Sequence, residues 1–317
     1  MVPDHRFGSL SAPDSELRFL TKFNALVIPN SIKPKNVSTV STRWRLRTRE
    51  LVFGRMPLIM GILNLTPDSF SDGGRFFTIQ SAVDQAKRLE DEGADILDIG
   101  GESTRPYSQA VDIADELSRV VPVLERILDK VKIPISIDTT KAGVAAAAID
   151  LGAEIINDVS GLEADPAMVE IARSRQTGVC AMHMQGTPQT MQDNPSYNNV
   201  VAEIVDYLKK RDEWLIAQGI APERVCLDPG IGFGKSHAHN LELVQKAGEF
   251  HAIGRPILIG HSRKGFIAKV LGNKDIDRCF GTVGVSLALA LQRIQVLRVH
   301  DVAANKQALQ LFLASTF

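Results

Sequence analysis

Short hydrophobic runs alternate with helical patterns along this chain from Pro57 onward. The runs are PLIMGILN (57–64), ADILDIGG (94–101), IPISIDT (133–139), AEIINDVS (153–160), GVCAMHM (178–184), RVCLDPG (224–230), PILIGHS (256–262) and VLRVHDV (296–302). Between them the hydrophobic spacing changes from that of a strand to that of a helix. Ile79, Val83, Ala86 and Leu89, for example, fall on one helical face. The pattern predicts eight strands that alternate with helices.

This strand–helix alternation favours a parallel sheet with right-handed crossovers. Eight such units in about 260 residues predict an eight-stranded parallel α/β barrel, the (β/α)8 TIM barrel. A doubly wound open sheet is the alternative, but that fold has a glycine-rich turn after its first strand. Here the first strand leads into NLTPDSF (64–70) instead. We therefore predict the barrel.

Two segments precede the first barrel strand. Residues 1–42 are polar, rich in Ser and Pro and only weakly periodic, so we predict a loosely ordered N-terminal extension there and a barrel domain at 43–317. The stretch WRLRTRELVFG (44–54) alternates hydrophobic and polar residues, which predicts a short hairpin.

Composition narrows the class of protein. The chain has 36 basic and 37 acidic residues, which gives no net-charge reason to expect a nucleic-acid partner or an anionic membrane surface. No hydrophobic stretch approaches the roughly 18 residues of a membrane-spanning helix, and the first residues lack the core of a secretory signal. The cysteines, Cys180, Cys226 and Cys279, are far apart and odd in number, which predicts reduced thiols and a cytoplasmic location.

In a TIM barrel the reactive groups stand at the carboxyl ends of the strands. Here nearly every predicted strand ends in a polar or charged residue. These residues include Asn64, Asp138, Asn157, His183, Asp228, Arg298 and His300. One polar residue at such a place is usual for a loop, but so many of them predict a polar site on one rim.

The polar residues of this rim form two chemical groups. Asp138, Asn157 and Asp228 carry hydrogen-bonding groups that suit a heterocycle with several N–H groups. The residues that are cationic, or can become so, are Arg105, Lys264, Arg298 and His300. Cations suit a phosphate or diphosphate, and Asn64 could complete a Mg²⁺ shell of water and phosphate oxygen. The rim predicts a nitrogen heterocycle that carries an anionic leaving group.

The stretch DPGIGFGKS (228–236) looks like a phosphate-binding loop. That motif needs a glycine where this chain has Pro229, and proline has no N–H to offer a phosphate. The stretch also follows the sixth predicted strand. We interpret its glycines as a turn beside Asp228 and see no need for Lys235 to contact a phosphate.

A series of motifs, taken in order, resembles that of the dihydropteroate synthase family. The motifs are GILNLTPDSFSDGG (61–74), DIGGESTRP (98–106), SIDT (136–139), IINDVSG (155–161), DPGIGFGK (228–235), GHSRK (260–264) and RVHD (298–301). The resemblance extends from about Trp44 to the last residues. It implies an enzyme that condenses 6-hydroxymethyl-7,8-dihydropterin diphosphate with 4-aminobenzoate to 7,8-dihydropteroate, with release of diphosphate in folate biosynthesis.

The resemblance also implies roles for single residues. The pterin would be held by Asp138, Asn157, Asp228 and Lys264, with Met182 against its face. The diphosphate side would comprise Asn64 with Mg²⁺, together with Thr104, Arg105, Arg298 and His300. The 4-aminobenzoate side would comprise Ser262, Phe70, Pro106 and Phe233. Catalysis would depend on Asp138, Asp228, Lys264, Arg105 and Asp68. A homodimer is also expected.

The loops after the first and second strands, TPDSFSDGGRF (66–76) and ESTRPYSQA (102–110), are rich in Gly, Ser and Pro. We expect them to close over the diphosphate and exclude water. Tyr107 stands where the family usually has glycine, which leaves the shape of the second loop open. Asp98 and Glu102 are expected to hydrogen-bond neighbouring backbone and loops. His183 has two interpretations, a pocket wall or a core residue.

Two other functions remain open at this point. A folate-binding methyltransferase shares the barrel and the pterin pocket but does not need the cationic motifs for a diphosphate. A non-enzymatic pterin-binding protein would keep the pocket and lose cations or loops, and only Tyr107 points that way.

Overall fold

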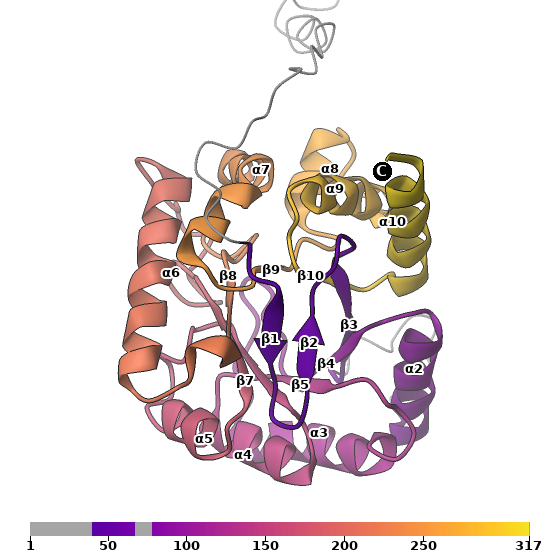
Figure 1. Ribbon diagram of the computed structural model, residues 1–317, viewed down its shortest axis with the longest axis vertical. Coiled ribbons are helices and arrows are strands. Elements are labelled where there is room, and N and C mark those ends of the chain that lie inside the picture. The colour runs from indigo at the N-terminus through magenta and orange to yellow at the C-terminus, as the bar shows by residue number, and fades with distance from the viewer. Residues whose placement is uncertain (1–39, 67–77, 317) are drawn as a thin grey trace, which may run out of the picture. The chain divides into compact units, whose positions relative to one another are not determined.

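Parallel strands arranged around a common axis form the centre of the protein. The computed structural model describes residues 40–66 and 78–316. Its eight-stranded sheet has the order β8-β7-β6-β5-β4-β3-β10-β9, and a parallel bridge between Leu227 and Ile257 joins the two ends. Figure 1 looks onto one end of this closed sheet, with helices in a ring around it. The predicted TIM barrel is confirmed.

Each barrel strand lies within one of the predicted hydrophobic runs. The strands are β3 (Leu58–Asn64), β4 (Ile96–Gly100), β5 (Ile135–Asp138), β6 (Ile155–Asp158), β7 (Gly178–Met182), β8 (Val225–Asp228), β9 (Leu258–Ile259) and β10 (Val296–Val299). The α-helices are α2 (Ile79–Asp91), α3 (Ile113–Ile127), α4 (Ala142–Leu151), α5 (Met168–Ser174), α6 (Val200–Ala217), α7 (His237–Gln245), α8 (Gly265–Val270), α9 (Cys279–Leu291) and α10 (Val302–Thr316). Two 3-10 helices, η3 (Pro222–Arg224) and η4 (Ala247–Ile253), lie before β8 and β9.

Local sequence sets several helix boundaries. The Thr78 side chain accepts a hydrogen bond from the Ser81 N–H and so begins α2, and Asp112 begins α3 in the same way. At the end of α4, Gly152 has φ 137°, a backbone conformation that favours glycine. Among the helices of the described residues, none has the length and hydrophobicity needed to cross a membrane.

Side chains on each strand alternate between two hydrophobic layers. On β4, Leu97 and Ile99 belong to the layer between strands and helices, whereas Ile96 belongs to the layer inside the barrel. The strand residues of this inner layer are Met60, Ile96, Ile155, Cys180, Cys226, Leu258 and Val296, all of them buried. Two positions further along several of these strands, the inward residue is polar. The barrel therefore has a hydrophobic floor beneath a polar mouth.

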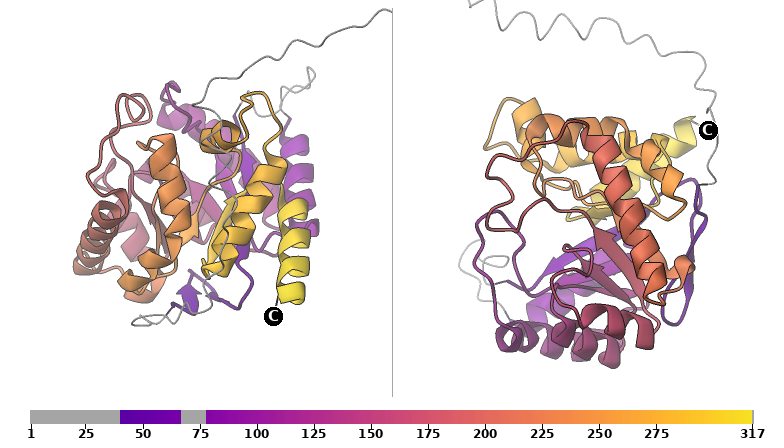
Figure 2. Two further views of the ribbon diagram at one scale, coloured as in Figure 1. Left: turned by 90° about the horizontal axis from the view of Figure 1, so that it is seen from above. Right: turned by 90° about the vertical axis from the view of Figure 1, so that its left-hand side faces the viewer.

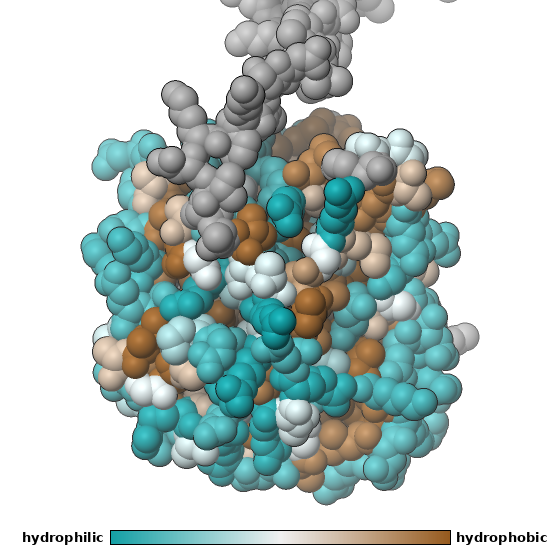
Figure 3. Space-filling view, viewed as in Figure 1, coloured by the Kyte–Doolittle hydropathy of each residue, from teal (hydrophilic) through white to brown (hydrophobic). Residues whose placement is uncertain are grey.

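A hairpin covers the floor. Its strands, β1 (Arg43–Arg45) and β2 (Glu50–Val52), pair antiparallel and confirm the predicted hairpin. Trp44 is fully buried, and its Nε1 donates to the Arg224 carbonyl oxygen at 2.8 Å. The Arg224 guanidinium donates in turn to the Leu46 carbonyl oxygen at 2.6 Å. The hairpin crosses one end of the barrel (Figures 1 and 2), and the surface on this side of the molecule is largely hydrophilic (Figure 3). The opposite end is the mouth.

Candidate active site

Arg298 is the centre of a charged network inside the mouth. Its Nε donates to Asp98 Oδ2 and its Nη2 donates to Asp138 Oδ2, both at 2.6 Å. Asn157 Nδ2 also donates to Asp98 Oδ2, at 3.2 Å. These residues belong to β10, β4, β5 and β6, and the two carboxylates are 0% and 9% exposed. Because a buried charge is tolerated only when it is paired, the guanidinium allows both carboxylates to lie here.

Asp98 corrects one expectation from the sequence. Within the described residues its Oδ2 accepts from Arg298 and Asn157, which come from other strands, and its Oδ1 has no backbone partner. A signal was present in the strand pattern. Asp98 lies between Leu97 and Ile99, both of which face the helices, so its own side chain points into the barrel. A charge placed there needs a partner.

Asp228 and Lys264 lie on the other side of the same mouth. Asp228 is the last residue of β8, and Lys264 Nζ lies 4.1 Å from the centre of the Phe233 ring. Gly260 lies between Asp228 and Arg298, because a Cβ there would be 3.9 Å from Asp228 Oδ2 and 3.8 Å from Arg298 Cδ. The structure therefore brings together, at one end of the barrel, the side chains that the sequence analysis proposed for the pterin.

Burial changes the protonation of the two carboxyl groups that face the mouth. It raises the pKa of Asp228 to about 6, although the Gly230 N–H and the cations around it act in the opposite direction. Burial also raises the pKa of Asp138, with Arg298 opposing the shift and Asp98 adding to it. Both carboxyl groups therefore bind a proton more readily than they would in water. Shifts of this kind are frequent in active sites.

Lys264 and His300 show the effect of burial on basic groups. Burial, followed by the charge of Arg298, lowers the pKa of Lys264 to about 8, so the amine is still mostly protonated at pH 7. The same two causes lower the pKa of His300 to about 3. The imidazole is therefore neutral at pH 7 in this structure. Its Nδ1 lies 3.0 Å from Ser262 Oγ.

The glycine turn after β8 packs against the end of β7. Gly230, Gly232 and Gly234 have φ angles of 71°, 85° and 66°, which favour glycine. A Cβ on Gly230 would lie 2.0 Å from the His183 carbonyl oxygen, so a larger residue would displace the turn. His183 is itself buried, and Lys235 is only 2% exposed. The stretch is a tight turn, as interpreted, and the structure adds that the Lys235 side chain faces the protein interior.

The remaining strand-end residues complete the mouth. A hydrophobic wall consists of Val159, Met182, Met191 and Phe233, all buried. Asn64 is the last residue of β3, is half-buried, and pairs in register with Gly100 of β4. Gly100 in turn pairs with Asp138 of β5, so Asn64 lies at the same edge of the barrel as the charged network.

The loop between β4 and α3 is attached at its base and at its tip. At the base, Lys141 Nζ lies 2.6 Å from Glu102 Oε2. At the tip, Tyr107 has φ 62°, its backbone N–H donates to the Pro188 carbonyl oxygen at 3.0 Å, and its hydroxyl donates to Asp193 Oδ1 at 3.1 Å. Tyr107 therefore adopts a left-handed backbone conformation and binds the segment that follows β7.

Several predicted residues lie outside the charged network or outside the described residues. Thr104 is half-buried, whereas Arg105 and Pro106 are exposed. As far as the described residues show, the Arg298 network does not include Arg105. Asp68 and Phe70 fall in the segment 67–77, which the structure does not describe. The closing roles proposed for these residues stay predictions.

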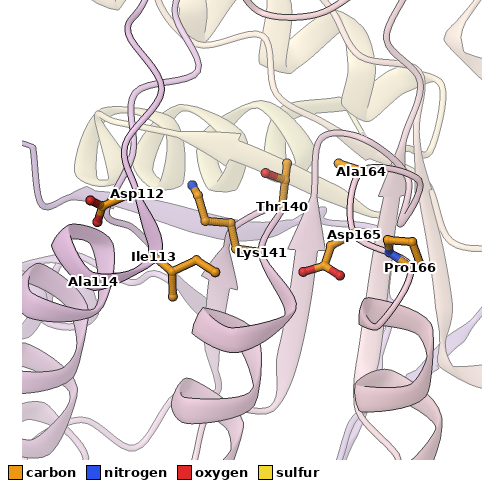
Figure 4. A pocket seen from close by; sticks show the side chains of 8 residues that line it. All are labelled: Asp112, Ile113, Ala114, Thr140, Lys141, Ala164, Asp165 and Pro166. Carbon is orange, nitrogen blue, oxygen red and sulfur yellow. The ribbon is translucent and has the colours of Figure 1, made fainter.

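An open cavity of about 560 Å³ lies beside the mouth, at the beginning of α3 and α4. Figure 4 shows Asp112, Lys141 and Asp165 around it. Lys141 is already paired with two carboxylates, those of Glu102 and Glu116. The lining residues of the cavity are all different from those of the charged network, so we assign the chemistry to the mouth and not to this cavity.

Comparison with known proteins agrees with this geometry. Residues 60–300 match the family described as pterin binding enzyme. The chain is also 45% identical over 260 residues to a dihydropteroate synthase of Haemophilus influenzae, an alignment that covers 82% of this chain and 94% of that protein. The chain belongs to the dihydropteroate synthase family of pterin-binding enzymes.

Solved structures of dihydropteroate synthases share this fold. The structure of the Xanthomonas albilineans enzyme with 4-aminobenzoic acid has a TM-score of 0.81 at 42% identity, covering 87% of this chain and 98% of that chain. The structure of the same organism's enzyme in complex with 7,8-dihydropteroate has a TM-score of 0.77 at 39% identity, covering 86% and 98%. The match includes almost the whole of each solved chain.

Proposed function

We propose that this protein condenses 6-hydroxymethyl-7,8-dihydropterin diphosphate with 4-aminobenzoate to 7,8-dihydropteroate and releases diphosphate, as a pterinylmethyl transferase of folate biosynthesis. The observation that carries the proposal is the buried network in which Arg298 holds Asp98 and Asp138 at one barrel mouth, opposite Asp228 and Lys264. Family members with 4-aminobenzoic acid and 7,8-dihydropteroate bound support the same pair of ligands.

Pterin binding would use the hydrogen-bonding groups of the mouth. The carboxylates of Asp138 and Asp228 suit the N–H groups along a pterin edge, because buried donors require acceptors. The Asn157 amide nitrogen already belongs to the network, which leaves its oxygen to accept a further bond. Lys264 can donate to a ring oxygen or nitrogen, and Met182 offers a polarisable contact to the ring face.

The reaction would proceed by loss of diphosphate and attack by the amine. The C–O bond to the pterin methylene breaks, and its electron pair leaves with the diphosphate oxygen. The positive charge on the methylene carbon spreads over the pterin ring, where the carboxylates of Asp138 and Asp228 can offset it. The amine of 4-aminobenzoate then forms the C–N bond and loses a proton. No protein nucleophile is required.

The diphosphate side would combine Mg²⁺ with protein groups. In the described part of the chain, no group of three or more His, Cys, Asp or Glu could hold a metal ion. Asn64 offers one uncharged oxygen at the mouth, which suits Mg²⁺ when diphosphate oxygens and water supply the rest of its shell. The bound ion would neutralise charge on the leaving diphosphate.

The second substrate would lie between this centre and the loops. Ser262, whose Oγ is held 3.0 Å from His300 Nδ1, would face the carboxylate of 4-aminobenzoate, with Phe233 and Pro106 beside the ring. The two loops after β3 and β4, which carry Asp68 on the first and Thr104 and Arg105 on the second, would close over the diphosphate. Closure would exclude water, which could otherwise capture the cation.

We propose a homodimer as the assembled form. Large hydrophobic side chains are exposed on or beside α8, α9 and α10. They are Val270, Leu271, Ile276, Phe280, Leu291 and Leu311. A hydrophobic area of this kind suits contact with a second copy of the chain. Light scattering would measure the mass in solution, and the mass of a single chain would contradict the dimer.

We also propose a cytoplasmic location. The cysteines Cys180, Cys226 and Cys279 are all free thiols. Free thiols are typical of proteins that stay in a reducing compartment.

A turnover assay tests the proposed function. Purified protein is mixed with the pterin diphosphate, 4-aminobenzoate and Mg²⁺, and we expect diphosphate and 7,8-dihydropteroate to form in equal amounts. Asp228→Asn is the matched control, because it preserves size and should lose most turnover. Pterin binding without diphosphate release would contradict the proposal. That result would favour a non-enzymatic binder or a folate-binding methyltransferase.

A further inference from the structure

The amine of Lys235 lies inside the protein, behind the glycine turn that follows β8. The residue is 2% exposed. Its Nζ donates to the Phe233 carbonyl oxygen at 2.8 Å and to the His183 carbonyl oxygen at 3.3 Å, and lies 3.0 Å from His183 Nδ1. Burying an amine is unfavourable unless such contacts compensate it. The reaction proposed above makes no direct use of this group.

These contacts join two segments of the mouth that are far apart in sequence. His183 follows β7, whereas Phe233 lies in the turn after β8. The segments are in close contact, because a Cβ on Gly234 would lie 2.4 Å from the Gln185 carbonyl oxygen. Burial lowers the pKa of His183 to about 3, so its imidazole is neutral beside the amine at pH 7. Lys235 thus ties the turn to the end of a barrel strand.

Phe233 links the Lys235 contacts to Lys264, a residue of the mouth. Its ring lies 4.1 Å from Lys264 Nζ, within the range of a cation–π contact. A Cβ on Gly232 would lie 2.9 Å from Lys264 Cδ, so the turn also touches the stem of that lysine. A shift of the Phe233 backbone would therefore move the Lys264 amine relative to the pterin site.

We propose that Lys235 is a positioning residue for the condensation: its amine fixes the Phe233 backbone and, through the Phe233 ring, sets the position of the Lys264 amine. The inference rests on the proposed function, in which Lys264 binds the pterin. Lys235 itself touches no substrate. Fixed geometry matters here because a displacement of about 1 Å can slow a reaction roughly 100-fold.

The first test replaces the amine and keeps the length of the side chain. In Lys235→Met we expect kcat to fall roughly ten- to a hundredfold. KM for the pterin diphosphate should change less than kcat, because the contacts on the Arg298 side of the mouth still bind the pterin. Titration of active sites with 7,8-dihydropteroate removes any effect of partial unfolding. A wild-type kcat per active site would overturn the proposal.

Tyr197→Phe is the matched control. The Tyr197 hydroxyl donates to the Gly234 carbonyl oxygen at 2.9 Å, which is the next carbonyl along the same turn. The variant loses one hydrogen bond to the turn and keeps the contact between Lys235 and Phe233. We expect a lower Tm and a wild-type kcat. If kcat falls as far as in Lys235→Met, the turn has only a structural role and the proposal is wrong.

A double-mutant cycle tests the connection through the ring. Phe233→Leu removes the ring and leaves the carbonyl that Lys235 holds. The kcat is compared at saturating 4-aminobenzoate, so that loss of the contact between the Phe233 ring and that substrate appears in KM. We expect the double variant to lose no more kcat than the more impaired of the two single variants, because both act on Lys264 through one contact. If the two losses in kcat multiply in the double variant, Lys235 and Phe233 act independently and the connection is refuted.

If Lys235→Met does not fold, Lys235→Gln replaces it. Its shorter side chain cannot span both partners, so an unchanged kcat would overturn the proposal.

The wild-type protein separates this inference from the proposed function. If it releases no diphosphate, the proposed function fails and the inference fails with it. If it turns over normally and Lys235→Met does so equally well, only the inference fails.

Discussion

The floor and the mouth of the barrel are built on the same strands and differ in physical character. On several strands the inward residue changes from hydrophobic to polar within two positions. The pairs are Ile96 and Asp98, Ile155 and Asn157, Cys226 and Asp228, and Val296 and Arg298. The floor is closed by Trp44, whereas the mouth collects carboxylates and cations.

This difference separates stability from reactivity. At the floor, burial of hydrophobic surface stabilises the fold by roughly 25 cal/mol per Å² and needs no specific partner. At the mouth, burial raises the pKa of Asp228 to about 6, so holding this carboxylate ionised costs free energy at neutral pH. Floor variants should therefore lose stability and keep turnover. Most mouth variants should keep stability and lose turnover.

Arg298→Met should have the largest effect. Unlike other variants of the mouth, it should lose both stability and turnover. The variant leaves Asp98 and Asp138 buried without their cation. Breaking a buried pair from one side costs about 3–5 kcal/mol, which urea unfolding would measure. Turnover should fall at least roughly 1,000-fold, because the pterin pocket loses its charge balance. An unfolding free energy equal to that of the wild type would show that the carboxylates do not depend on Arg298.

Asp228→Asn should lose turnover and gain stability, as expected for a residue of the mouth. The amide oxygen can still accept from the Gly230 N–H, which the carboxylate now does at 2.7 Å. Turnover should fall roughly 100-fold, because the amide cannot offset positive charge on the ring. The free energy of unfolding at pH 7 should rise by about 1–3 kcal/mol, since a buried charge is removed. Loss of stability together with activity would contradict this division of roles.

The same variant has a predicted pH dependence. The folded-state pKa of Asp228 is about 6, above the ordinary value of 3.8, so the folded protein binds the proton first as pH falls. The carboxyl group therefore destabilises the wild type above pH 6, and this penalty disappears as the pH falls toward the ordinary value. The stability advantage of Asp228→Asn should shrink over that window. An advantage that is constant with pH would argue against a raised pKa.

Trp44→Ala tests the floor. The side chain is fully buried and closes the barrel, so its truncation should lower the free energy of unfolding by about 3–5 kcal/mol. The kcat of the protein that stays folded should not change, because Trp44 packs among the hydrophobic floor residues and its Nε1 bonds to Arg224. Trp44→Phe, as a control, should lose less stability. A large fall in kcat would mean that floor and mouth are coupled.

Tyr107→Phe should have the smallest effect. It removes the hydroxyl that binds Asp193 and keeps the backbone contact to Pro188. A hydrogen bond exposed to water contributes little, so stability should hardly change. Hydrogen exchange in residues 102–111 should become faster, and the KM for 4-aminobenzoate should rise roughly two- to threefold. Unchanged exchange would show that the hydroxyl does not hold the loop.

Some of the site could be predicted because its signals are local. Asp138, Asn157 and Asp228 each end a strand, and in a parallel barrel all strand ends of one kind meet at one rim. Asp98 was misjudged because its partners, Arg298 and Asn157, lie on other strands, and only the register of the barrel brings them together. The neutral state of His300 could not be predicted, because burial, which lowers its pKa, is not visible in a motif.

By itself the sequence determined the class of fold, the order of its strands, the hairpin and the family. These follow from hydrophobic periodicity and from motifs, both of which are read along the chain. Only the tertiary structure decided which charges pair, which imidazole is neutral and where the Lys235 amine points. Pairing and burial depend on distances between strands that are far apart in sequence, and the folded barrel sets those distances.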